Sequence, residues 1–292
     1  MQKYITSIVF GGLGNQMFQY AAGRALSLTY HVPFYLDVGW FVAQTQSAAL
    51  RSFQLNVFPA LSRAITGIRV APFSLSRRIW RRFCSLFPYS VSIREPGYNY
   101  WSGFEQIHPP AILNGYWQCE KYFSRHAGQI RRDFAFPSLP EGKASLLAER
   151  IQITSHAVSV HIRRGDYVND AKVQTFHGCM GADYYTKALH YIENHIGKTT
   201  LFLFSDDPSW VERNFDCCGH HAVIVNLSFP DAPHHDMHLM SLCRHHVIAN
   251  SSFSWWGAYL RKEKGIVVAP HRWFAEMSID TSDICPSEWS RI

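Results

Sequence analysis

The stretch AVSVHIRRGDY, residues 157–167, decides the fold and points to the chemistry. Its first half alternates aliphatic residues with smaller or polar ones, which predicts a buried β-strand. Its second half places Arg163 and Arg164 side by side where that strand ends. A buried strand that presents polar groups at its carboxyl end is typical of parallel α/β proteins, which bind ligands at that edge of the sheet.

The arginine pair favours a phosphorylated ligand. A guanidinium group is always charged, and its planar fork of donors grips phosphate oxygens at two points. Gly165 would let the backbone turn sharply past such a ligand. A surface loop with Arg–Asp ion pairs explains the same residues without any ligand. The stretch alone leaves both interpretations open.

Composition places the chain among packed globular proteins. Of its 292 residues, 47% are hydrophobic and 17% are charged, which excludes a disordered chain and allows one large domain or two modest ones. No run approaches the roughly 20 apolar residues that cross a bilayer. The opening segment MQKYITSIVF is expected to form a first strand rather than a signal peptide.

Charge and cysteine usage bear on partners and compartment. The 28 basic and 22 acidic residues leave a mild excess of +6, which suits an anionic ligand or a membrane surface, and we expect no nucleic-acid partner. The seven cysteines follow no disulfide framework. We therefore expect reduced thiols in a cytoplasmic protein.

Strands alternate with helices on both sides of FPSLPEGK, residues 136–143, which is the best candidate for a linker. This order predicts an α/β protein of two parallel-sheet, Rossmann-type domains that face each other, residues 1–140 and 141–292. The aromatic-rich stretch 97–136 in the first domain either lines an acceptor site or builds core.

The loop GGLGNQ, residues 11–16, stands between a predicted strand and a predicted helix. That geometry points backbone N–H groups at an anion and places Gly14 and Asn15 beside it. A tight turn with Asn15 as the helix cap explains the loop equally simply. A dinucleotide-binding fingerprint is a third interpretation, although Met17 occupies the place of its third glycine and only Asp37 supports it.

Two adjacent carboxylates, Asp206 and Asp207, end another buried strand, and Pro208 then suits the start of a helix. The D-x-D spacing of metal-using transferases is absent. Helix capping, or contacts with ribose and base, is therefore favoured over a metal site.

A second strand–helix junction carries Asn250, Ser251 and Ser252, and it has the form of a second phosphate cradle. Nearby histidines and cysteines invite a zinc interpretation, but their spacing matches no standard site, and we expect no metal. These residues are His234, His235, His238, His245, His246, Cys217, Cys218, His220 and His221.

The segment FSLSRRIWRRFCSLF, residues 73–87, predicts a basic amphipathic helix with Arg77, Arg78, Arg81 and Arg82 on one side. Such a helix can lie on an anionic membrane, which would make the protein peripheral on the cytoplasmic membrane face. The alternative is that its apolar side packs on the protein and the arginines are solvated.

Four motifs together resemble the α-1,2-fucosyltransferases of glycosyltransferase family 11: GGLGNQMFQYA, HIRRGDY, FSDDPSW and DMHLMSLCRHHVIANSSFSWWGAYL. The resemblance implies a GT-B fold and a GDP-fucose donor, with no metal or other cofactor. It also implies an inverting transfer of fucose to the 2-hydroxyl of a terminal galactose in an oligosaccharide or glycolipid.

By the same resemblance, Arg163 is expected to contact the diphosphate, and Asp236 to accept from the guanine N–H groups. His161 is expected to contribute its backbone, and Asp206 and Asp207 to shape the donor pocket. The donor-site residues implied are Gly14, Asn15, His161, Arg163, Arg164, Asp206, Asp207, Asp236, Asn250, Ser251 and Ser252.

The base that removes the acceptor's proton is undecided among Asp166, Asp170 and His177, and Asp166 is equally suited to bracing the arginines. A dissociative mechanism with little help from a base also stays open. A transferase with another GDP-sugar or linkage would use the same residues. A non-catalytic nucleotide- or glycan-binding protein is the more distant alternative.

Overall fold

The structure is a computed structural model that describes residues 3–44, 51–70, 91–164, 175, 178–227, 232–276 and 278–292. The chain divides into two compact units. Unit 1 comprises residues 1–137 with Ser282–Ile284, and unit 2 comprises residues 138–281 with Cys285–Ile292. A short segment near the end of the chain therefore belongs to unit 1, which a prediction of two consecutive domains does not include.

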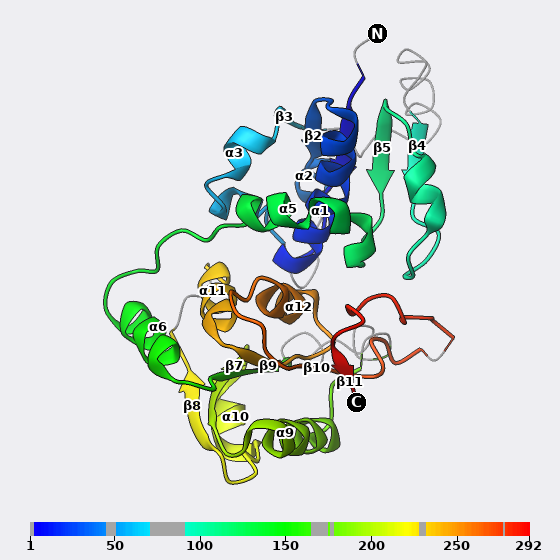
Figure 1. Ribbon diagram of the computed structural model, residues 1–292. Helices are drawn as coiled ribbons and strands as arrows, with labels where there is room; N and C mark the ends of the chain where they lie inside the picture. The colour runs from blue at the N-terminus through cyan, green and yellow to red at the C-terminus, as the bar shows by residue number, and fades with distance from the viewer. Residues whose placement is uncertain are drawn as a thin grey trace. The chain divides into compact units, whose positions relative to one another are not determined.

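The strands of unit 1 are β1 (Ile5–Ile8), β2 (Phe34–Asp37), β3 (Gly67–Arg69), β4 (Val91–Arg94) and β5 (Ala111–Asn114). They form a five-stranded parallel sheet in the order β3-β2-β1-β5-β4 (Figure 1). The chain runs outward from β1 to β3 and then crosses to the other side for β4 and β5. The switch point, where open α/β sheets bind ligands, thus lies between β1 and β5.

The helices of unit 1 are α1 (Leu13–Tyr30), α2 (Gly39–Val42), α3 (Leu61–Ala64) and α5 (Ala127–Asp133). α1 packs tightly on the sheet, since a Cβ on Gly23 would lie 2.1 Å from Ser7 Oγ and 2.6 Å from the Phe34 ring. Tyr20 joins α1 to α5, because its hydroxyl donates to the buried Asp133 carboxylate at 2.8 Å.

The strands of unit 2 are β6 (Val158–Ile162), β7 (Thr200–Ser205), β8 (His221–Val225), β9 (His245–Val247), β10 (Val267–Ala269) and β11 (Ser290–Arg291). They form a parallel sheet in the order β11-β10-β9-β6-β7-β8. Every residue of β6 is buried, as its aliphatic pattern predicts. The switch point of this sheet lies between β6 and β9.

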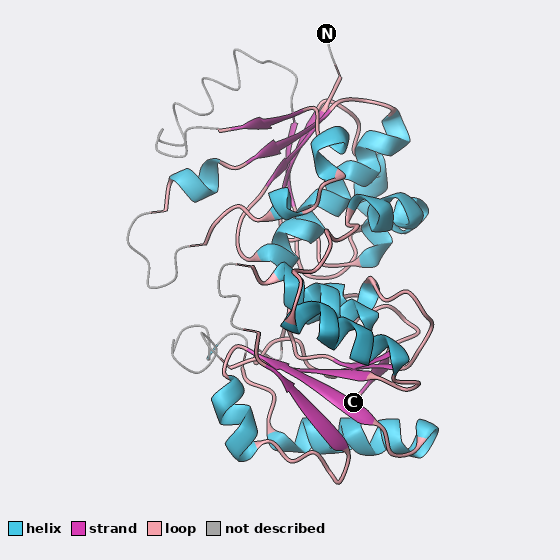
Figure 2. Cartoon of the chain, turned by 90° about the vertical axis from the view of Figure 1, so that its left-hand side faces the viewer, coloured by secondary structure: helices cyan, strands magenta, loops and turns pink. Residues whose placement is uncertain are grey.

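The helices of unit 2 are α6 (Lys143–Ile153), α9 (Ala182–Ile196), α10 (Pro208–Asn214), α11 (His234–Leu242) and α12 (Ser252–Tyr259). They cover both faces of the sheet (Figure 2). Alternate residues of β7 supply the two cores: Leu201 and Leu203 pack with α9 and α10, whereas Phe202 and Phe204 pack with α6 and α11. The expected α/β architecture of two parallel sheets is confirmed.

Two of the histidines that invited a zinc interpretation lie within a strand, because β9 begins at His245 and includes His246. Both histidines are buried and hydrogen-bonded: His246 Nδ1 lies 2.8 Å from Ser159 Oγ, and Ile266 N–H donates to His245 Nδ1 at 3.0 Å. Since these partners come from neighbouring strands, the sequence alone does not reveal them.

Three further expectations concern the chain as a whole. Within the described ranges, no helix is long and apolar enough to cross a bilayer. The six cysteines in those ranges are thiols and not disulfides. The predicted basic helix with Arg77, Arg78, Arg81 and Arg82 lies outside the described residues.

Candidate active site

The arginine pair lies at the carboxyl end of β6, beside the switch point of the unit 2 sheet. On one side Asp206 and Asp207 follow the end of β7. On the other side β9 leads into Asn250. The structure therefore brings these predicted residues to one edge of the sheet, because the carboxyl ends of parallel neighbours meet there. The side chains of Arg163 and Arg164 are each 23% exposed and remain accessible to a ligand.

Asp206 braces both arginines. One carboxylate oxygen, Oδ2, lies 2.6 Å from Nη1 of Arg163, and the other, Oδ1, accepts from the backbone N–H of Arg164 at 2.9 Å. A charge-assisted contact of this length orients the guanidinium at the end of the strand. The interpretation without a ligand expected Arg–Asp ion pairs, and Arg163 does form one. Its partner is Asp206, which follows β7.

Asp207 caps a helix, one of the two roles expected of it. Its Oδ1 accepts from the backbone N–H of Trp210 at 3.0 Å, and Pro208 occupies the first turn of α10. The Trp210 ring lies under the Arg164 guanidinium, with 3.6 Å from Cζ to the ring centroid. The cap therefore also positions a stacking platform for the second arginine.

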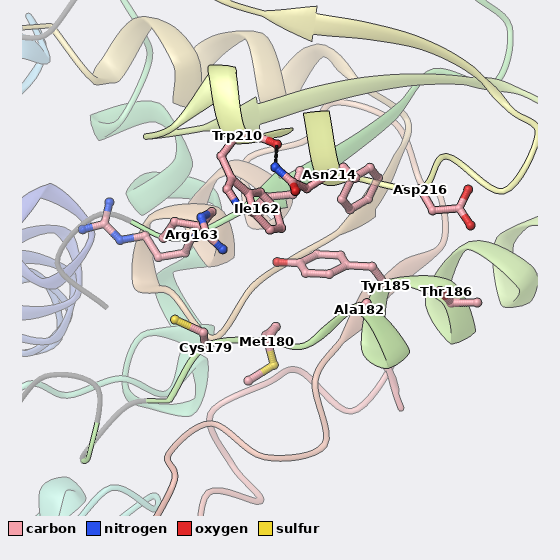
Figure 3. A pocket seen from close by; sticks show the side chains of 12 residues that line it. Ile162, Arg163, Cys179, Met180, Ala182, Tyr185, Thr186, Trp210, Asn214 and Asp216 are labelled. Carbon is pink, nitrogen blue, oxygen red and sulfur yellow. Dashed lines mark hydrogen bonds between the residues drawn. The ribbon is translucent and has the colours of Figure 1, made fainter. Parts of the chain in front are cut away.

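A hollow adjoins the arginine pair between the start of α9 and α10 (Figure 3). The hydroxyl of Tyr185 on α9 donates to the carbonyl of His161 at 3.0 Å, which ties α9 to the end of β6. The lining residues are Ile162, Arg163, Arg164, Cys179, Met180, Ala182, Tyr185, Thr186, Trp210, Asn214, Phe215 and Asp216.

His161 does not supply charge to the site. Burial lowers the pKa of this histidine to about 4; Arg163 acts in the same direction and Asp206 opposes it. The side chain is neutral at pH 7 and lies near the Phe253 ring, with centroids 5.8 Å apart. Its backbone carbonyl, which was expected to contribute to donor binding, accepts the hydrogen bond from Tyr185.

The second predicted cradle is used largely within the protein. The amide of Asn250 is buried and donates to the carbonyls of Gly178 at 3.2 Å and Trp273 at 3.1 Å. Ser251 caps α12, since its hydroxyl accepts from Phe253 N–H at 3.3 Å, and its own N–H donates to a backbone carbonyl. Asn250 therefore holds neighbouring loops in place and Ser251 caps a helix, and the role of Asn250, Ser251 and Ser252 in donor binding stays a prediction.

The glycine loop of unit 1 differs from its predicted form. The N-cap of α1 is Gly12, which makes no side-chain hydrogen bond, so Asn15 is not the cap. Instead, Asn15 Oδ1 accepts from Gln118 Nε2 at 2.8 Å, which connects the loop to the segment after β5. Gly11 has a φ of 76°, and a Cβ there would lie 2.9 Å from Asn15 Nδ2. Gly14 is buried in the first turn of α1.

Asp236 lies in the first turn of α11 and is partly buried. Burial raises the pKa of its carboxyl to about 6, and no hydrogen bond or ion pair joins it to a described residue. A carboxylate in this state suits the role of acceptor for donors on a ligand, which is the chemistry that the guanine assignment needs.

The candidate bases and the possible metal site are the remaining predictions. The candidate bases Asp166, Asp170 and His177 lie outside the described residues. In the part of the chain that is described, no three His, Cys, Asp or Glu side chains are grouped to hold a metal.

The sequence missed the contacts of Tyr185 and Trp210. Trp210 lies within a quoted motif at one helical turn from the cap, and that spacing is the signal that would have found it.

Comparisons with known proteins support a transferase site. A family model described as Glycosyl transferase family 11 matches residues 94–292. The alpha-1,2-colitosyltransferase of Escherichia coli is 33% identical and the match covers 97% of this chain and 96% of that protein. The O-antigen biosynthesis glycosyltransferase WbnK of Escherichia coli is also 33% identical, with 92% and 94% covered. Galactoside alpha-(1,2)-fucosyltransferase 2 of Oryctolagus cuniculus is 26% identical, with 86% and 65% covered.

A solved structure shares the fold. The NodZ alpha-1,6-fucosyltransferase, from a crystal soaked with GDP-fucose, superposes with a TM-score of 0.53 at 14% identity, covering 89% of this chain and 93% of that chain. This likeness concerns the fold alone, which is GT-B. Because the family model matches from residue 94 to the end and two relatives are 33% identical over nearly the whole chain, the chain belongs to glycosyl transferase family 11.

Proposed function

We propose that this glycosyltransferase moves L-fucose from GDP-β-L-fucose to the 2-hydroxyl of a terminal galactose, with inversion and without a metal. The observation that carries the proposal is the braced arginine pair at the switch point of the unit 2 sheet. Two relatives, an alpha-1,2-colitosyltransferase and a galactoside alpha-(1,2)-fucosyltransferase, support the 1,2 linkage.

The chemistry requires positive charge where the donor breaks. Cleavage of the bond between fucose and phosphate develops negative charge on the departing nucleotide diphosphate, and fixed donors aimed at that charge accelerate the reaction. Arg163 is the leaving-group stabiliser in this proposal, since Asp206 holds its guanidinium at the strand end. Arg164, stacked on Trp210, supplies a second positive group beside it.

We assign the general base to Asp166. The sequence left this residue either as base or as brace for the arginines. Asp206 already holds both arginines in place, so Asp166 is not needed for that role. In this assignment Asp166 accepts the proton of the galactose 2-hydroxyl as that oxygen attacks the anomeric carbon and GDP departs.

A second donor is a candidate because of one specific observation. A relative of 33% identity transfers colitose, a sugar that differs from fucose in lacking the 3-hydroxyl. A site built to hydrogen-bond a hydroxyl rejects the analogue without it by about 10⁴-fold, whereas a site that ignores that position accepts both sugars. Comparing kcat/KM for GDP-fucose and GDP-colitose separates the two candidates.

The decisive experiment is an acceptor screen with radiolabelled GDP-fucose, followed by linkage analysis of the product. We expect label on galactose-terminated oligosaccharides or glycolipids, attached α-1,2. Label on another carbon would replace the linkage assignment. Release of GDP only from other GDP- or UDP-sugars would replace the donor assignment, and tight glycan binding with no GDP released would indicate a binding protein.

A further inference from the structure

A partly buried carboxylate in unit 1 has no place in the donor chemistry. Glu95 follows β4, at the edge of the sheet where β1 and β5 also end. Its Oε2 accepts from the backbone N–H of Tyr116 at 2.7 Å and of Trp117 at 2.9 Å. Both of these hydrogen bonds use Oε2, Oε1 accepts from none of the described residues, and the residue is partly exposed.

The surrounding backbone is shaped to hold this carboxylate. A Cβ on Gly115 would lie 2.4 Å from Glu95 Cβ and 2.7 Å from Oε2, so this position requires glycine. Trp117 adopts a φ of 56°, a conformation that residues with side chains rarely take. A glutamine would accept the same two hydrogen bonds without burying a charge. A purely structural role therefore does not explain why the residue is an acid.

Aromatic rings flank the carboxylate. Tyr98 and Tyr116 are stacked with centroids 6.1 Å apart, and Phe10 meets Tyr116 edge-on at 5.0 Å. All three rings are partly exposed. Burial is the main cause that raises the pKa of Glu95, to about 7, and the two backbone donors oppose it.

Such a combination suits an uncharged sugar. A pyranose has an apolar C–H face, which packs on aromatic rings, and hydroxyls, which donate to a carboxylate. The site lies beside the unit 1 switch point, where Asn15 of the glycine loop meets Gln118. We propose that Glu95 Oε1 accepts a hydrogen bond from a hydroxyl of the acceptor galactoside, whose C–H face packs on Tyr98 and Tyr116. This inference rests on the proposed function for the identity of the sugar.

The first test is Glu95→Gln, which turns the accessible acceptor into an amide. We expect the KM for lactose to rise about tenfold. The KM for GDP-fucose, the affinity for GDP and the slow hydrolysis of donor without acceptor should stay within about twofold. Glu105→Gln is the matched control, because this exposed carboxylate of unit 1 pairs with Arg125 and lies outside the proposed subsite. Glu105→Gln should leave both KM values, the affinity for GDP and the rate of donor hydrolysis unchanged.

A second variant keeps the inference testable if Glu95→Gln does not fold. Tyr98→Ala removes a stacking ring and leaves the carboxylate, and it should raise the lactose KM about fivefold with GDP affinity unchanged. An unchanged lactose KM in every folded variant overturns the inference and leaves the proposed function standing.

The proposed sugar subsite can be tested independently of the proposed transfer reaction. If the wild-type protein transfers nothing to galactosides, saturation-transfer NMR with lactose in the absence of donor still tests the subsite. Weaker lactose signals with Glu95→Gln than with wild type would support the subsite without the transfer reaction. Equal signals, or none with either protein, would overturn it.

Discussion

At the residue scale, one carboxylate determines how the arginine pair is presented. Asp206 contacts the guanidinium of Arg163 with one oxygen and the backbone of Arg164 with the other. A long side chain held before the ligand arrives loses less freedom on binding, and donors fixed in advance stabilise a developing charge best. We therefore expect the contact with Asp206 to affect the rate more than the stability, since both partners are partly exposed.

Arg163→Lys should lower kcat by about 10²–10³-fold while the protein stays folded. Lysine keeps the charge but loses the planar fork that contacts Asp206 and that we propose also contacts the diphosphate. Steady-state kinetics with GDP-fucose measure the effect, and the far-UV circular dichroism spectrum monitors folding. A kcat like that of wild type would remove Arg163 from the mechanism.

Asp206→Asn should lower kcat/KM by about 10–100-fold, because the amide no longer attracts the guanidinium. A role through Arg163 makes a further prediction: in the Arg163→Lys background, the same change should cost much less. Kinetics of the two single variants and the double variant test this coupling. Additive losses would mean that Asp206 acts independently of Arg163.

At the element scale, the start of α10 depends on Asp207. Asp207→Ala removes the acceptor for Trp210 N–H and should lower the free energy of unfolding by about 1 kcal/mol. Urea denaturation measures the loss. Glu212→Ala is the control, since this exposed residue of the same helix makes no cap and alanine is a good helix former. Equal stability of the two variants would contradict the capping role.

The turn after β4 predicts a pH dependence. Because burial raises the pKa of Glu95 from 4.5 to about 7, the folded state favours the protonated carboxyl. The protonated Glu95 carboxyl therefore stabilises the folded state relative to the unfolded chain. This contribution is fully present below pH 4.5 and is lost as pH rises to about 7. The titratable groups that interact with it, Tyr98, Tyr116 and Tyr122, have raised pKa values and stay neutral in this window.

Glu95→Gln should remove this dependence. Between pH 5 and pH 8, wild type should lose on the order of 2 kcal/mol of unfolding free energy relative to the variant. Urea denaturation of both proteins at the two pH values measures the difference. Parallel pH profiles would show that the carboxyl titrates in the folded protein as it does in the unfolded chain.

At the scale of the whole molecule, two parallel sheets each place polar groups at a switch point. In unit 1 these groups surround Asn15 and Glu95, and in unit 2 they surround the arginine pair. The two proposals together assign uncharged-sugar chemistry to the first unit and anion chemistry to the second. Each unit carries this chemistry at the carboxyl edge of its own sheet, where strand ends gather residues that are far apart in the chain.

We expect the proposed reaction of the whole enzyme to need no metal, since arginines would supply the positive charge. Full activity is therefore expected in excess EDTA, with labelled fucose transfer as the measurement. Loss of activity in EDTA that Mg²⁺ restores would overturn the metal-free assignment. If Mg²⁺ restored the activity and other divalent ions did not, Mg²⁺ would be identified as the cation required.

The sequence by itself determined the α/β class, the two parallel sheets and the family resemblance. These depend on local patterns: the buried strand before Arg163, the glycines after β1 and the proline after Asp207. Hydrophobic period and turn chemistry are properties of short segments, so the chain alone displays them.

Only the tertiary structure decided which side chains are partners. Asp206 is 43 residues from Arg163 along the chain, yet β6 and β7 are paired neighbours, and their strand ends place the two in contact. The hydrogen bonds of Asn250 to backbone carbonyls and those of Glu95 with backbone N–H groups likewise depend on segments distant in sequence. Sequence patterns specify elements, whereas hydrogen-bond partners and burial follow from how those elements pack.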